Sequence, residues 1–374
     1  MKVIVDNKIP FIEGVLEPFV DVEYYAGKDI SREKVKDADA LIIRTRTKCN
    51  ADLLEGSSVK FIATATIGFD HIDTVFCKLK NIVWTNAPGC NSGSVMQYIA
   101  SAILAWAEEQ HIKIEDRVLG VVGVGNVGEK VVKLGEILGM QVLLNDPPRE
   151  REEGSCGFVS LKGILRDADI ISFHIPLNYE GPDKTFHLVN DQFLTQLNKG
   201  TLLINSSRGE VIDTLSLKEY LALGFPKYAI LDVWEHEPDI DLNLLSKLYY
   251  ATSHIAGYST DGKANGTKHS VQALSKFFDL GIDDWEPELI PVPPDSSIRY
   301  DGENKNFQQI VTDLVLHTYK VSSDSKKLKS KPEHFEKLRG NYPLRREFFA
   351  YDVQLENVQE DYRRKLRRLG FNII

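Results

Sequence analysis

Cysteine is scarce in this sequence, with only 4 among 374 residues. No two of them form a C-x-x-C pair or take the spacing of a zinc site, which argues against a structural metal centre. So small a number also argues against a disulfide-stapled secreted scaffold. We therefore expect reduced thiols in a cytoplasmic protein that holds no metal. The cysteines are Cys49, Cys77, Cys90 and Cys156.

Long hydrophobic runs are missing as well. No apolar stretch approaches the roughly 18 residues that are needed to span a bilayer. Lys2, Asp6 and Lys8 place charges where a signal peptide would have its apolar core. The sequence therefore predicts no membrane partner.

An excess of positive charge is also absent, since 45 Lys and Arg stand against 54 Asp and Glu, for a net charge of -9. Such a balance argues against a general affinity for nucleic acid. A basic run does occur at residues 363–368. We interpret it as a solvated or dimer-facing helix surface rather than a nucleic-acid or membrane site. The length of the chain is typical of two or three domains.

The clearest pattern that is present lies at residues 118–128, VLGVVGVGNVG. Its apolar beginning is typical of a buried parallel strand. Gly123, Gly125 and Gly128 follow, and the apolar residues after them recur at helical spacing. A strand, a glycine turn and a helix in this order bind the pyrophosphate of a dinucleotide, because the free N–H groups at the helix start face the anion. We therefore predict a dinucleotide site here.

Asp146 stands at the end of the next apolar run. At this place an acidic residue hydrogen-bonds the adenine ribose. A carboxylate would repel a 2′-phosphate, so the sequence favours NAD over NADP. Arg149 follows closely and weakens that preference.

Short strands alternate with helical stretches on both sides of the glycine segment, which predicts parallel sheets covered by helices. Near the N-terminus we expect helices at residues 11–19, 31–36 and 51–55. Arg44 and Arg46 follow one predicted strand and would suit an anionic substrate, although ordinary loop chemistry is an equal alternative. Near the C-terminus we expect a proline-rich linker and then a further unit, in which residues 322–331 form a charged loop.

Three successive strands after the glycine segment end at Arg208, Asp232 and His254. The carboxyl ends of parallel strands share one edge of the sheet, so these residues should lie at the edge that holds the cofactor. His254 is the best base for an alcohol proton, because imidazole titrates near neutrality. Glu237 would fix its tautomer, and Arg208 would grip a carboxylate. Each residue taken singly is more often structural, but their joint position favours catalysis.

Other histidines are weaker candidates. His236 lies in a loop rather than at a strand end, and His71 could support the neighbouring Thr66 segment. His174 should lie near the cofactor, with a structural role as an equal alternative.

Four motifs in this order resemble the D-isomer-specific 2-hydroxyacid dehydrogenases. The motifs are Gly123-x-Gly125-Asn126-Val127-Gly128, Asn205-x-x-Arg208-Gly209, Asp232-Val233-Trp234-x-x-Glu237-Pro238 and Ser253-His254-Ile255-Ala256-Gly257. The resemblance implies an α/β fold in which a Rossmann-type NAD domain (residues 96–257) is inserted into a flavodoxin-like substrate domain (residues 1–95 and 258–286). It also implies a small α+β C-terminal dimerisation domain (residues 287–374).

The resemblance further implies residue roles. Arg208, Glu237 and His254 would be catalytic, with His254 as proton donor and acceptor. Ile175 stands where the family often has a threonine, so its contact would be made through backbone or packing. The implied substrate contacts are Thr45, Thr66 and Tyr258. The implied NAD contacts are Gly123, Gly125, Asn126, Val127, Gly128, Asp146, Ile175, Ser206, Ser207, Asp232 and Gly257.

Additional segments resemble one branch of the family, whose members carry a C-terminal dimerisation domain. These segments are Thr64-Ala65-Thr66-x-Gly68-x-Asp70-His71, Ala87-Pro88-Gly89-Cys90-Asn91, His254-Ile255-Ala256-Gly257-Tyr258 and Lys337-Leu338-Arg339-x-Asn341-Tyr342-x-x-Arg345-Arg346-Glu347. This narrower resemblance implies a homodimer that oxidises 4-phospho-D-erythronate to (R)-3-hydroxy-2-oxo-4-phosphooxybutanoate with NAD, on the route to pyridoxal 5′-phosphate. One alternative is another D-2-hydroxyacid dehydrogenase, acting on phosphoglycerate, glycerate or lactate. A second is a non-catalytic NAD-sensing scaffold. We also hypothesise that Arg339, Arg345 or Arg346 reaches the partner subunit and binds the substrate phosphate.

Overall fold

The computed structural model describes residues 1–155 and 157–374. The chain forms two compact units, each built from two segments. The first consists of Met1–Asn91 and Ser259–Pro291, and the second of Ser92–Tyr258 and Val292–Ile374. In the described part of the chain, no helix is long and apolar enough to cross a membrane. The exact domain boundaries expected from the sequence stay predictions.

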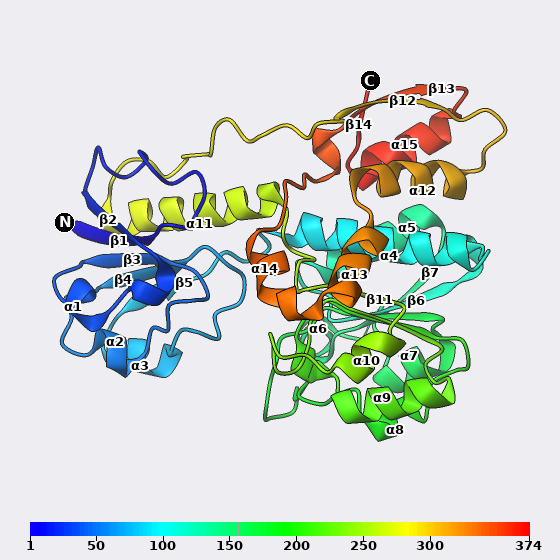
Figure 1. Cartoon of the computed structure of the whole chain (residues 1–374), viewed down its shortest axis with the longest axis horizontal. Coiled ribbons are helices and arrows are strands. Elements are labelled where there is room, and N and C mark those ends of the chain that lie inside the picture. Colours follow the sequence, from blue (N-terminus) through cyan, green and yellow to red (C-terminus); the bar gives the residue numbers. More distant parts are fainter. Residues whose placement is uncertain (156) are drawn as a thin grey trace. The chain divides into compact units, whose positions relative to one another are not determined.

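The first unit is built on a five-stranded sheet in the order β2-β1-β3-β4-β5, with all strands parallel (Figure 1). This order is that of flavodoxin-like sheets, and it reverses between β1 and β3, where such folds open a crevice. Every residue of β3 and β4 is buried, because apolar residues cover both faces of the sheet. The strands are β1 (Lys2–Asp6), β2 (Asp21–Tyr25), β3 (Ala40–Ile43), β4 (Phe61–Thr64) and β5 (Val83–Thr85).

Helices of the first unit come from both of its segments. Helix α11 packs against β4 although it lies far away in the sequence. A Cβ atom on its Gly266 would come within 2.5 Å of the carbonyl oxygen of Ala65, so the close approach requires glycine. The helices are α1 (Arg32–Val35), α2 (Ala51–Leu54), α3 (Thr74–Leu79) and α11 (Thr260–Phe278).

The helix expected at residues 11–19 is wrong, because this segment is a series of turns. Phe11 and Gly14 have φ angles of 63° and 83°, in the left-handed region that a right-handed helix does not use. Pro18 lacks the N–H group that a helix interior needs. Ile12 and Leu16 are nevertheless buried, so the apolar spacing that resembles a helix serves an irregular segment packed on the core.

The second unit contains a six-stranded parallel sheet in the order β11-β10-β9-β8-β6-β7. The order reverses between β6 and β8, which is where a Rossmann-type fold binds its dinucleotide. The predicted fold class is therefore confirmed. The strands are β6 (Val118–Val122), β7 (Gln141–Asn145), β8 (Ile170–Phe173), β9 (Leu202–Asn205), β10 (Tyr228–Leu231) and β11 (Tyr250–Ala251).

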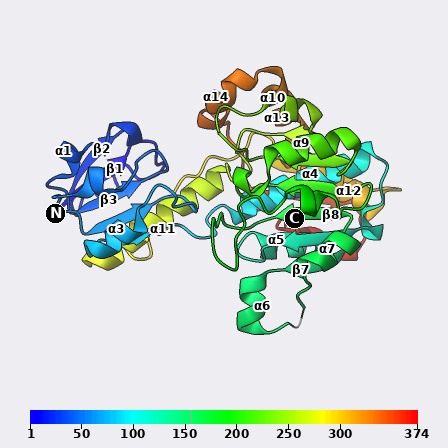
Figure 2. The same ribbon diagram turned by 90° about the horizontal axis from the view of Figure 1, so that it is seen from below.

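Helices surround this sheet. Helix α4, the first element of the second unit, is almost wholly buried. Figure 2 shows α6 beyond the end of β7. This helix begins directly after Asp146, the residue predicted to contact the ribose. The helices are α4 (Ser92–Glu109), α5 (Gly128–Leu138), α6 (Pro147–Glu153), α7 (Leu161–Asp167), α8 (Asp191–Leu194), α9 (Thr214–Leu223) and α10 (Leu242–Lys247).

The C-terminal segment of the second unit adds a parallel three-stranded sheet in the order β12-β13-β14. Helix α12 packs against α4, α15 against α5, and α13 against both α4 and β11. The segment therefore shares its core with the dinucleotide-binding region (Figure 1). Its elements are β12 (Ser297–Asp301), α12 (Phe307–Thr318), α13 (Val321–Ser330), α14 (Phe335–Gly340), β13 (Asp352–Glu356), α15 (Glu360–Leu369) and β14 (Asn372–Ile373).

The charged loop expected at residues 322–331 is wrong, because this segment forms α13. Val321, Ser325 and Leu328 recur at helical spacing and are buried, while the remaining polar residues cover the outer face. The Ser325 hydroxyl accepts a hydrogen bond of 3.0 Å from the N–H of Ala251 in β11. A polar residue thus serves as a buried partner for an edge strand, which hydrophobic patterning does not reveal.

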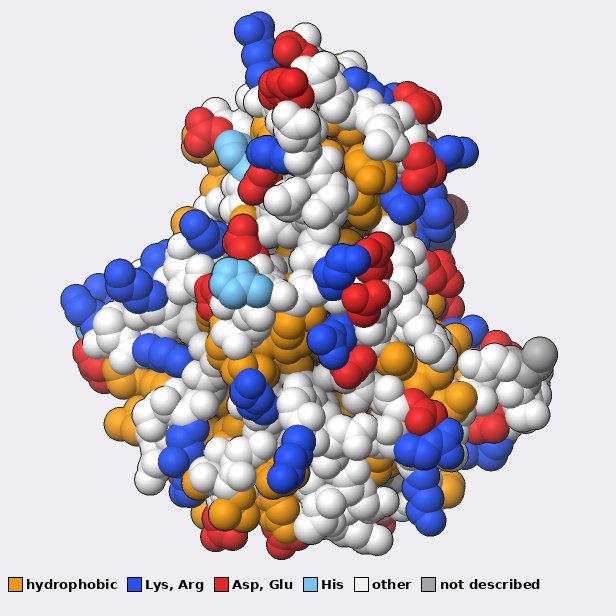
Figure 3. Space-filling view, turned by 90° about the vertical axis from the view of Figure 1, so that its right-hand side faces the viewer, with side chains coloured by type: hydrophobic (Ala, Val, Ile, Leu, Met, Phe, Trp, Pro, Cys, Tyr) orange, Lys and Arg blue, Asp and Glu red, His pale blue; other side chains and the backbone are white. Residues whose placement is uncertain are grey.

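The basic run at residues 363–368 lies on α15, where several of its charges are paired. Arg364 and Lys365 both contact Asp361, and Arg367 contacts Glu360. On the face drawn in Figure 3, acidic and basic side chains are interspersed. Three of the five basic residues of the run are therefore paired with acidic residues of the same helix.

Replacing Ser325 with Ala should lower the free energy of unfolding by about 1–3 kcal/mol, because the buried N–H of Ala251 loses its acceptor. Ser330→Ala on the same helix is the matched control, since that hydroxyl is exposed and only bonds within its own turn. Chemical denaturation of both variants measures the difference. Equal stabilities would show that this contact does not hold α13 on the sheet.

Candidate active site

The glycine turn after β6 lies against the segment that follows β8. Gly123 has a φ of 87°, and a Cβ atom there would come within 2.6 Å of both the His174 carbonyl oxygen and Ile175 Cγ2. A Cβ atom on Gly128 would lie 2.0 Å from the Gly123 carbonyl oxygen. Two of the three glycines are therefore required by the fold itself, because they bring the turn, α5 and the end of β8 together. Ile175 packs against the glycine turn, and its expected contact with the cofactor stays a prediction.

Gly125 differs from its neighbours, because a Cβ atom there would meet no protein atom within 4 Å. Helix α5 begins next to it without a side-chain cap. At the end of β9, on the same edge of the sheet, the Ser206 hydroxyl is buried without a hydrogen-bond partner among the described residues. An open glycine, an uncapped helix start and an unsatisfied hydroxyl fit a dinucleotide pyrophosphate well.

The Asp146 carboxylate already accepts hydrogen bonds from backbone N–H groups of this chain. The donors are Val124 (2.8 Å) and Arg149 (3.1 Å), so Asp146 caps α6 and joins it to the glycine turn. The predicted ribose contact would use its remaining acceptor capacity. The Arg149 guanidinium is held by Glu129 and Glu153. Its charge is therefore engaged with carboxylates and is a poor partner for a 2′-phosphate, which supports the preference for NAD.

His254 and Glu237 form a direct pair. Nδ1 of His254 lies 2.8 Å from Oε2 of Glu237, and Oε1 of Glu237 accepts a 3.0 Å hydrogen bond from the N–H of Trp234. Burial alone would raise the pKa of Glu237, but the hydrogen bond from His254, its charge and that of Arg339 hold the pKa below its usual value. An ionised Glu237 makes Nδ1 the donor, so Nε2 of His254 is left to exchange a proton.

Asp232, at the end of β10, holds the loop that carries His254. Its buried carboxylate accepts hydrogen bonds from the Thr252 hydroxyl (2.6 Å) and from the N–H groups of Ile255 and Ala256 (both 2.8 Å). His254 adopts a φ of 57°, a conformation that a non-glycine residue keeps only when its surroundings enforce it. Asp232 therefore orients the histidine through the backbone, and its predicted cofactor contact stays a prediction.

Arg208 follows β9 in a turn that Asn205 shapes. The Asn205 side chain donates to the Arg208 carbonyl oxygen (2.8 Å) and accepts from the Ser207 N–H and hydroxyl. A Cβ atom on Gly209 would lie 2.0 Å from the Trp234 carbonyl carbon, so the Arg208 turn packs directly on the loop that leads to Glu237. The structure thus gathers the ends of β9, β10 and β11, with Arg208, Asp232 and His254, at one edge of the sheet, as predicted, and Glu237 joins them through its bond to His254.

The predicted substrate residues divide between the two units. Tyr258 belongs to the second unit, and Thr45 and Thr66 follow β3 and β4 of the first. Thr45 is exposed, whereas the Thr66 hydroxyl lies 2.8 Å from that of Thr64, which in turn lies 3.1 Å from His71 Nε2. Burial lowers the pKa of His71, so the ring is neutral at physiological pH. The expectation that His71 supports the Thr66 segment is consistent with this chain of hydrogen bonds.

The other histidines differ from His254 in their surroundings. His236 is exposed, and the structure gives it no part in the pair with Glu237. His174 bonds the Ser172 hydroxyl at 2.9 Å, and burial lowers its pKa to about 3. His174 is therefore a neutral group that fixes the end of β8.

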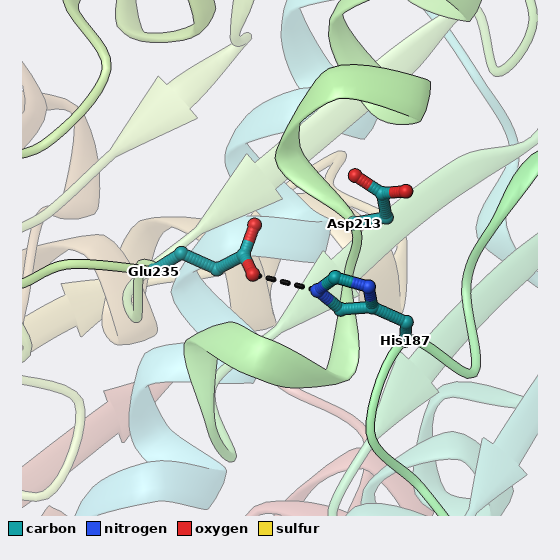
Figure 4. A group of neighbouring side chains, drawn as sticks. All are labelled: His187, Asp213 and Glu235. Carbon is teal, nitrogen blue, oxygen red and sulfur yellow. Dashed lines mark hydrogen bonds and ion pairs between the residues drawn. The ribbon is translucent and has the colours of Figure 1, made fainter.

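A second cluster, unnoticed in the sequence, contains His187, Asp213 and Glu235 (Figure 4). Their ligand atoms lie within 4.8 Å of one another, an arrangement that resembles a metal site. Each carboxylate is however already used: Glu235 accepts from His187 Nε2 (2.7 Å) and the Thr214 N–H (2.9 Å). Asp213 caps α9 by accepting from the Leu215 N–H and the Ser216 hydroxyl. The cluster is best explained as a structural one, in which Glu235 fixes the loop preceding Glu237 by hydrogen bonds to His187 and Thr214.

Sequence reasoning proposed that Arg339, Arg345 or Arg346 reaches a partner subunit's site, and the structure corrects this for Arg345. The part of the hypothesis that concerns Arg346 stays a prediction. Arg345 is 4% exposed, and its guanidinium donates within the same chain to Gln97 and to three carbonyl oxygens, including those of Ile255 and Ala256. Arg339 lies beside Glu237 and Tyr258 of its own chain. These contacts arise from tertiary packing, so no local pattern indicates them.

The described cysteines Cys49, Cys77 and Cys90 are buried and form no disulfide with one another. Burial raises the pKa of Cys49 to about 12, so its thiol stays protonated and unreactive. Cys156 lies outside the described residues.

Gly125→Ala and Gly128→Ala should separate ligand binding from folding. The Gly125 variant should keep its stability but bind NAD about tenfold or more weakly, a loss of roughly 1.4 kcal/mol or more, because the methyl group would occupy the open cradle. The Gly128 variant should lose about 1–3 kcal/mol of stability from overpacking against Gly123. Thermal unfolding and NAD titration by fluorescence measure both effects. Tight NAD binding by Gly125→Ala would contradict the cradle.

Comparison with known proteins agrees with this geometry. Residues 98–256 match the family model described as "D-isomer specific 2-hydroxyacid dehydrogenase, NAD binding domain". A second model, described only as a domain of unknown function, matches residues 289–370. Among solved structures, D-lactate dehydrogenase from Aquifex aeolicus superimposes with a TM-score of 0.64 and 24% identity, covering 76% of this chain and 97% of that one. The 3-phosphoglycerate dehydrogenase of Entamoeba histolytica gives the same TM-score and identity, covering 78% and 99%. These structures share the fold.

Sequence relatives cover almost the whole chain. The erythronate-4-phosphate dehydrogenase of Bacteroides thetaiotaomicron is 51% identical over 354 residues, which are 94% of this chain and 99% of that protein. The enzyme of the same name from Proteus mirabilis is 40% identical over 375 residues, covering 100% of this chain and 99% of the relative. The C-terminal segment is included in both matches. This chain therefore belongs to the erythronate-4-phosphate dehydrogenase family of D-isomer-specific 2-hydroxyacid dehydrogenases.

Proposed function

We propose that this protein oxidises 4-phospho-D-erythronate at C2 with NAD and produces (R)-3-hydroxy-2-oxo-4-phosphooxybutanoate. The observation that carries the proposal is the 2.8 Å bond between His254 and Glu237 at the edge of the dinucleotide-binding sheet. The names of the full-length relatives support the substrate. The family resemblance implies that this reaction lies on the route to pyridoxal 5′-phosphate.

The proton chemistry follows from the pair. Since Glu237 accepts the hydrogen bond from Nδ1, Nε2 of His254 takes the proton of the C2 hydroxyl as the carbonyl forms. The ionised Glu237 then stabilises the imidazolium. Arg208 supplies a planar guanidinium that binds the substrate carboxylate and orients the C2 oxygen. NAD, when bound, accepts the hydride that leaves C2.

The proposed cofactor contacts combine backbone and side chains. The turn from Gly123 to Gly128 would face the pyrophosphate, and Asp146 the adenine ribose. The unsatisfied hydroxyl of Ser206 supports a contact from the β9 turn. Ser207, Asp232, Ile175 and Gly257 are proposed to contribute through the backbone or through packing. Thr45, Thr66 and Tyr258 are proposed to contact the substrate.

Other members of the D-2-hydroxyacid dehydrogenase family act on other substrates, such as phosphoglycerate, glycerate or lactate. The C-terminal segment argues against the small substrates. The lactate and phosphoglycerate enzymes that share the fold align with about three quarters of this chain, whereas the erythronate-4-phosphate enzymes align with nearly all of it. A non-catalytic NAD-sensing scaffold is disfavoured by the ordered His254–Glu237 pair, which a scaffold would not need. We further propose a cytoplasmic homodimer that forms through the C-terminal domain.

The purified protein should reduce NAD in the presence of 4-phospho-D-erythronate, as followed by NADH absorbance, and prefer it over 3-phosphoglycerate, glycerate and D-lactate. His254→Ala should lower kcat by about 100-fold or more, because general base catalysis contributes about 10²–10⁴. Arg208→Ala should also lose most of the turnover, because the substrate carboxylate and the C2 oxygen lose the guanidinium that orients them. Both should keep their affinity for NAD. No NADH formation, under conditions in which a relative is active, would refute the proposed reaction. A variant with near wild-type turnover would refute the role of that residue.

The proposed dimer predicts a mass in solution of about twice the 42.2 kDa chain. Light scattering coupled to size exclusion measures this mass over a range of concentrations. A monomer at all concentrations would contradict the proposal without affecting the proposed chemistry.

A further inference from the structure

Arg339, on α14 of the C-terminal segment, lies among the residues of the candidate active site. Its Nη1 is 3.5 Å from Oε2 of Glu237, the same oxygen that bonds His254 Nδ1 at 2.8 Å. Its Nε donates a 3.1 Å hydrogen bond to the Tyr258 hydroxyl. One guanidinium thus contacts both the carboxylate partner of the base and a predicted substrate residue.

The position of Arg339 is well defined by packing. Its side chain is 22% exposed, and Phe335 at the start of the same helix is 1% exposed in the core. The following segment places Tyr342 edge-on to the Tyr258 ring at 6.3 Å and bonds its hydroxyl to Asp324 at 2.6 Å. All these residues belong to the second compact unit. The contact is therefore a property of one chain and needs no partner subunit.

We propose that Arg339 is a positioning residue that fixes Glu237 and Tyr258 and, through its charge, sets the pH range in which the His254–Glu237 pair works. The proposal rests on the proposed dehydrogenase function. It also assigns a role to part of the segment that matches a domain of unknown function.

The electrostatic argument concerns a shared carboxylate. A Glu237 that faces only an imidazole would stabilise imidazolium with its full charge. The nearby guanidinium offsets part of that charge, so its removal should let Glu237 stabilise the imidazolium more strongly. At an effective dielectric constant of about 20, two charges several ångströms apart interact strongly enough for a change of about one pH unit or more.

Charged groups from three further elements lie near the His254–Glu237 pair. They are Arg339 on α14, Asp232 at the end of β10 and Arg208 in the turn after β9. Burial would lower the pKa of Arg339, but the neighbouring Tyr258, Glu237 and Asp232 raise it, so the residue stays a cation. Asp232 and Arg208 are the same in every variant below, so a change on replacing Arg339 reports its guanidinium.

The test uses the full-length protein with Arg339→Gln, which removes the charge, and Arg339→Lys, which keeps it. Lys337→Gln is the matched control, because this residue lies on the same helix with an exposed side chain. Initial rates of NADH formation with 4-phospho-D-erythronate are measured from pH 6 to 10, together with NAD affinity and thermal unfolding.

For Arg339→Gln we expect kcat/KM at neutral pH to fall about tenfold or more and the acidic limb of its pH profile to move about one unit upward. Arg339→Lys should keep the limb close to wild type, and Lys337→Gln should match wild type throughout. NAD affinity should not change in any of them. A structural role would lower stability or activity without moving the limb, so an unmoved limb in Arg339→Gln overturns the proposal.

A second measurement does not require turnover. Imidazole NMR signals of His254 are titrated in the wild type and in Arg339→Gln, and the variant should take up its proton at higher pH. If the wild type proves inactive on the substrate but this difference is present, the proposed function fails and the role of Arg339 stands. Identical titrations in an active enzyme overturn the role of Arg339 alone.

Discussion

The buried carboxylate of Asp232 is the constraint on which the candidate site depends. It accepts the N–H groups of Ile255 and Ala256, and Arg345 donates to the carbonyl oxygens of the same two residues. The loop is therefore held from both sides by charge-assisted hydrogen bonds, which are stronger than neutral ones. This over-determined backbone explains how His254 keeps a left-handed conformation beside Glu237. Asp232 and Arg345 therefore position His254 through the backbone of its loop and not through contacts with its imidazole ring.

The same logic applies to the other turns of this sheet edge. Asn205 shapes the Arg208 turn, Asp146 joins the glycine turn to α6, and Glu235 latches the loop before Glu237. In each case a side chain near a strand end satisfies backbone N–H or C=O groups that would otherwise be unpaired in a buried loop. Parallel strands bring the loops to one edge, and these polar side chains give each loop a single conformation.

The sequence was sufficient for features that depend on local patterns. The glycine turn, the parallel strands and the three strand ends with Arg208, Asp232 and His254 follow from short runs of residues, because strand and turn chemistry is local. It failed where burial is decided by distant partners. The apolar spacing at residues 11–19 is typical of a helix, but the segment forms turns. Helix α13 is polar in sequence, and its contact with β11 stabilises it. Asp232 was expected to bind the cofactor, and no pattern shows that both of its oxygens bond the protein.

The C-terminal segment is the part of the chain about which the sequence said least, and its packing argues against a purely external role. Arg345 is buried against the His254 loop, and α13 pairs with β11, the strand from which that loop begins. A segment that only joined two subunits would not need to insert a guanidinium under the catalytic loop, since burying a charge is costly unless every donor is satisfied. The geometry of His254 and the folding of this segment are therefore coupled. A related enzyme that lacks the segment must hold the equivalent loop by other means.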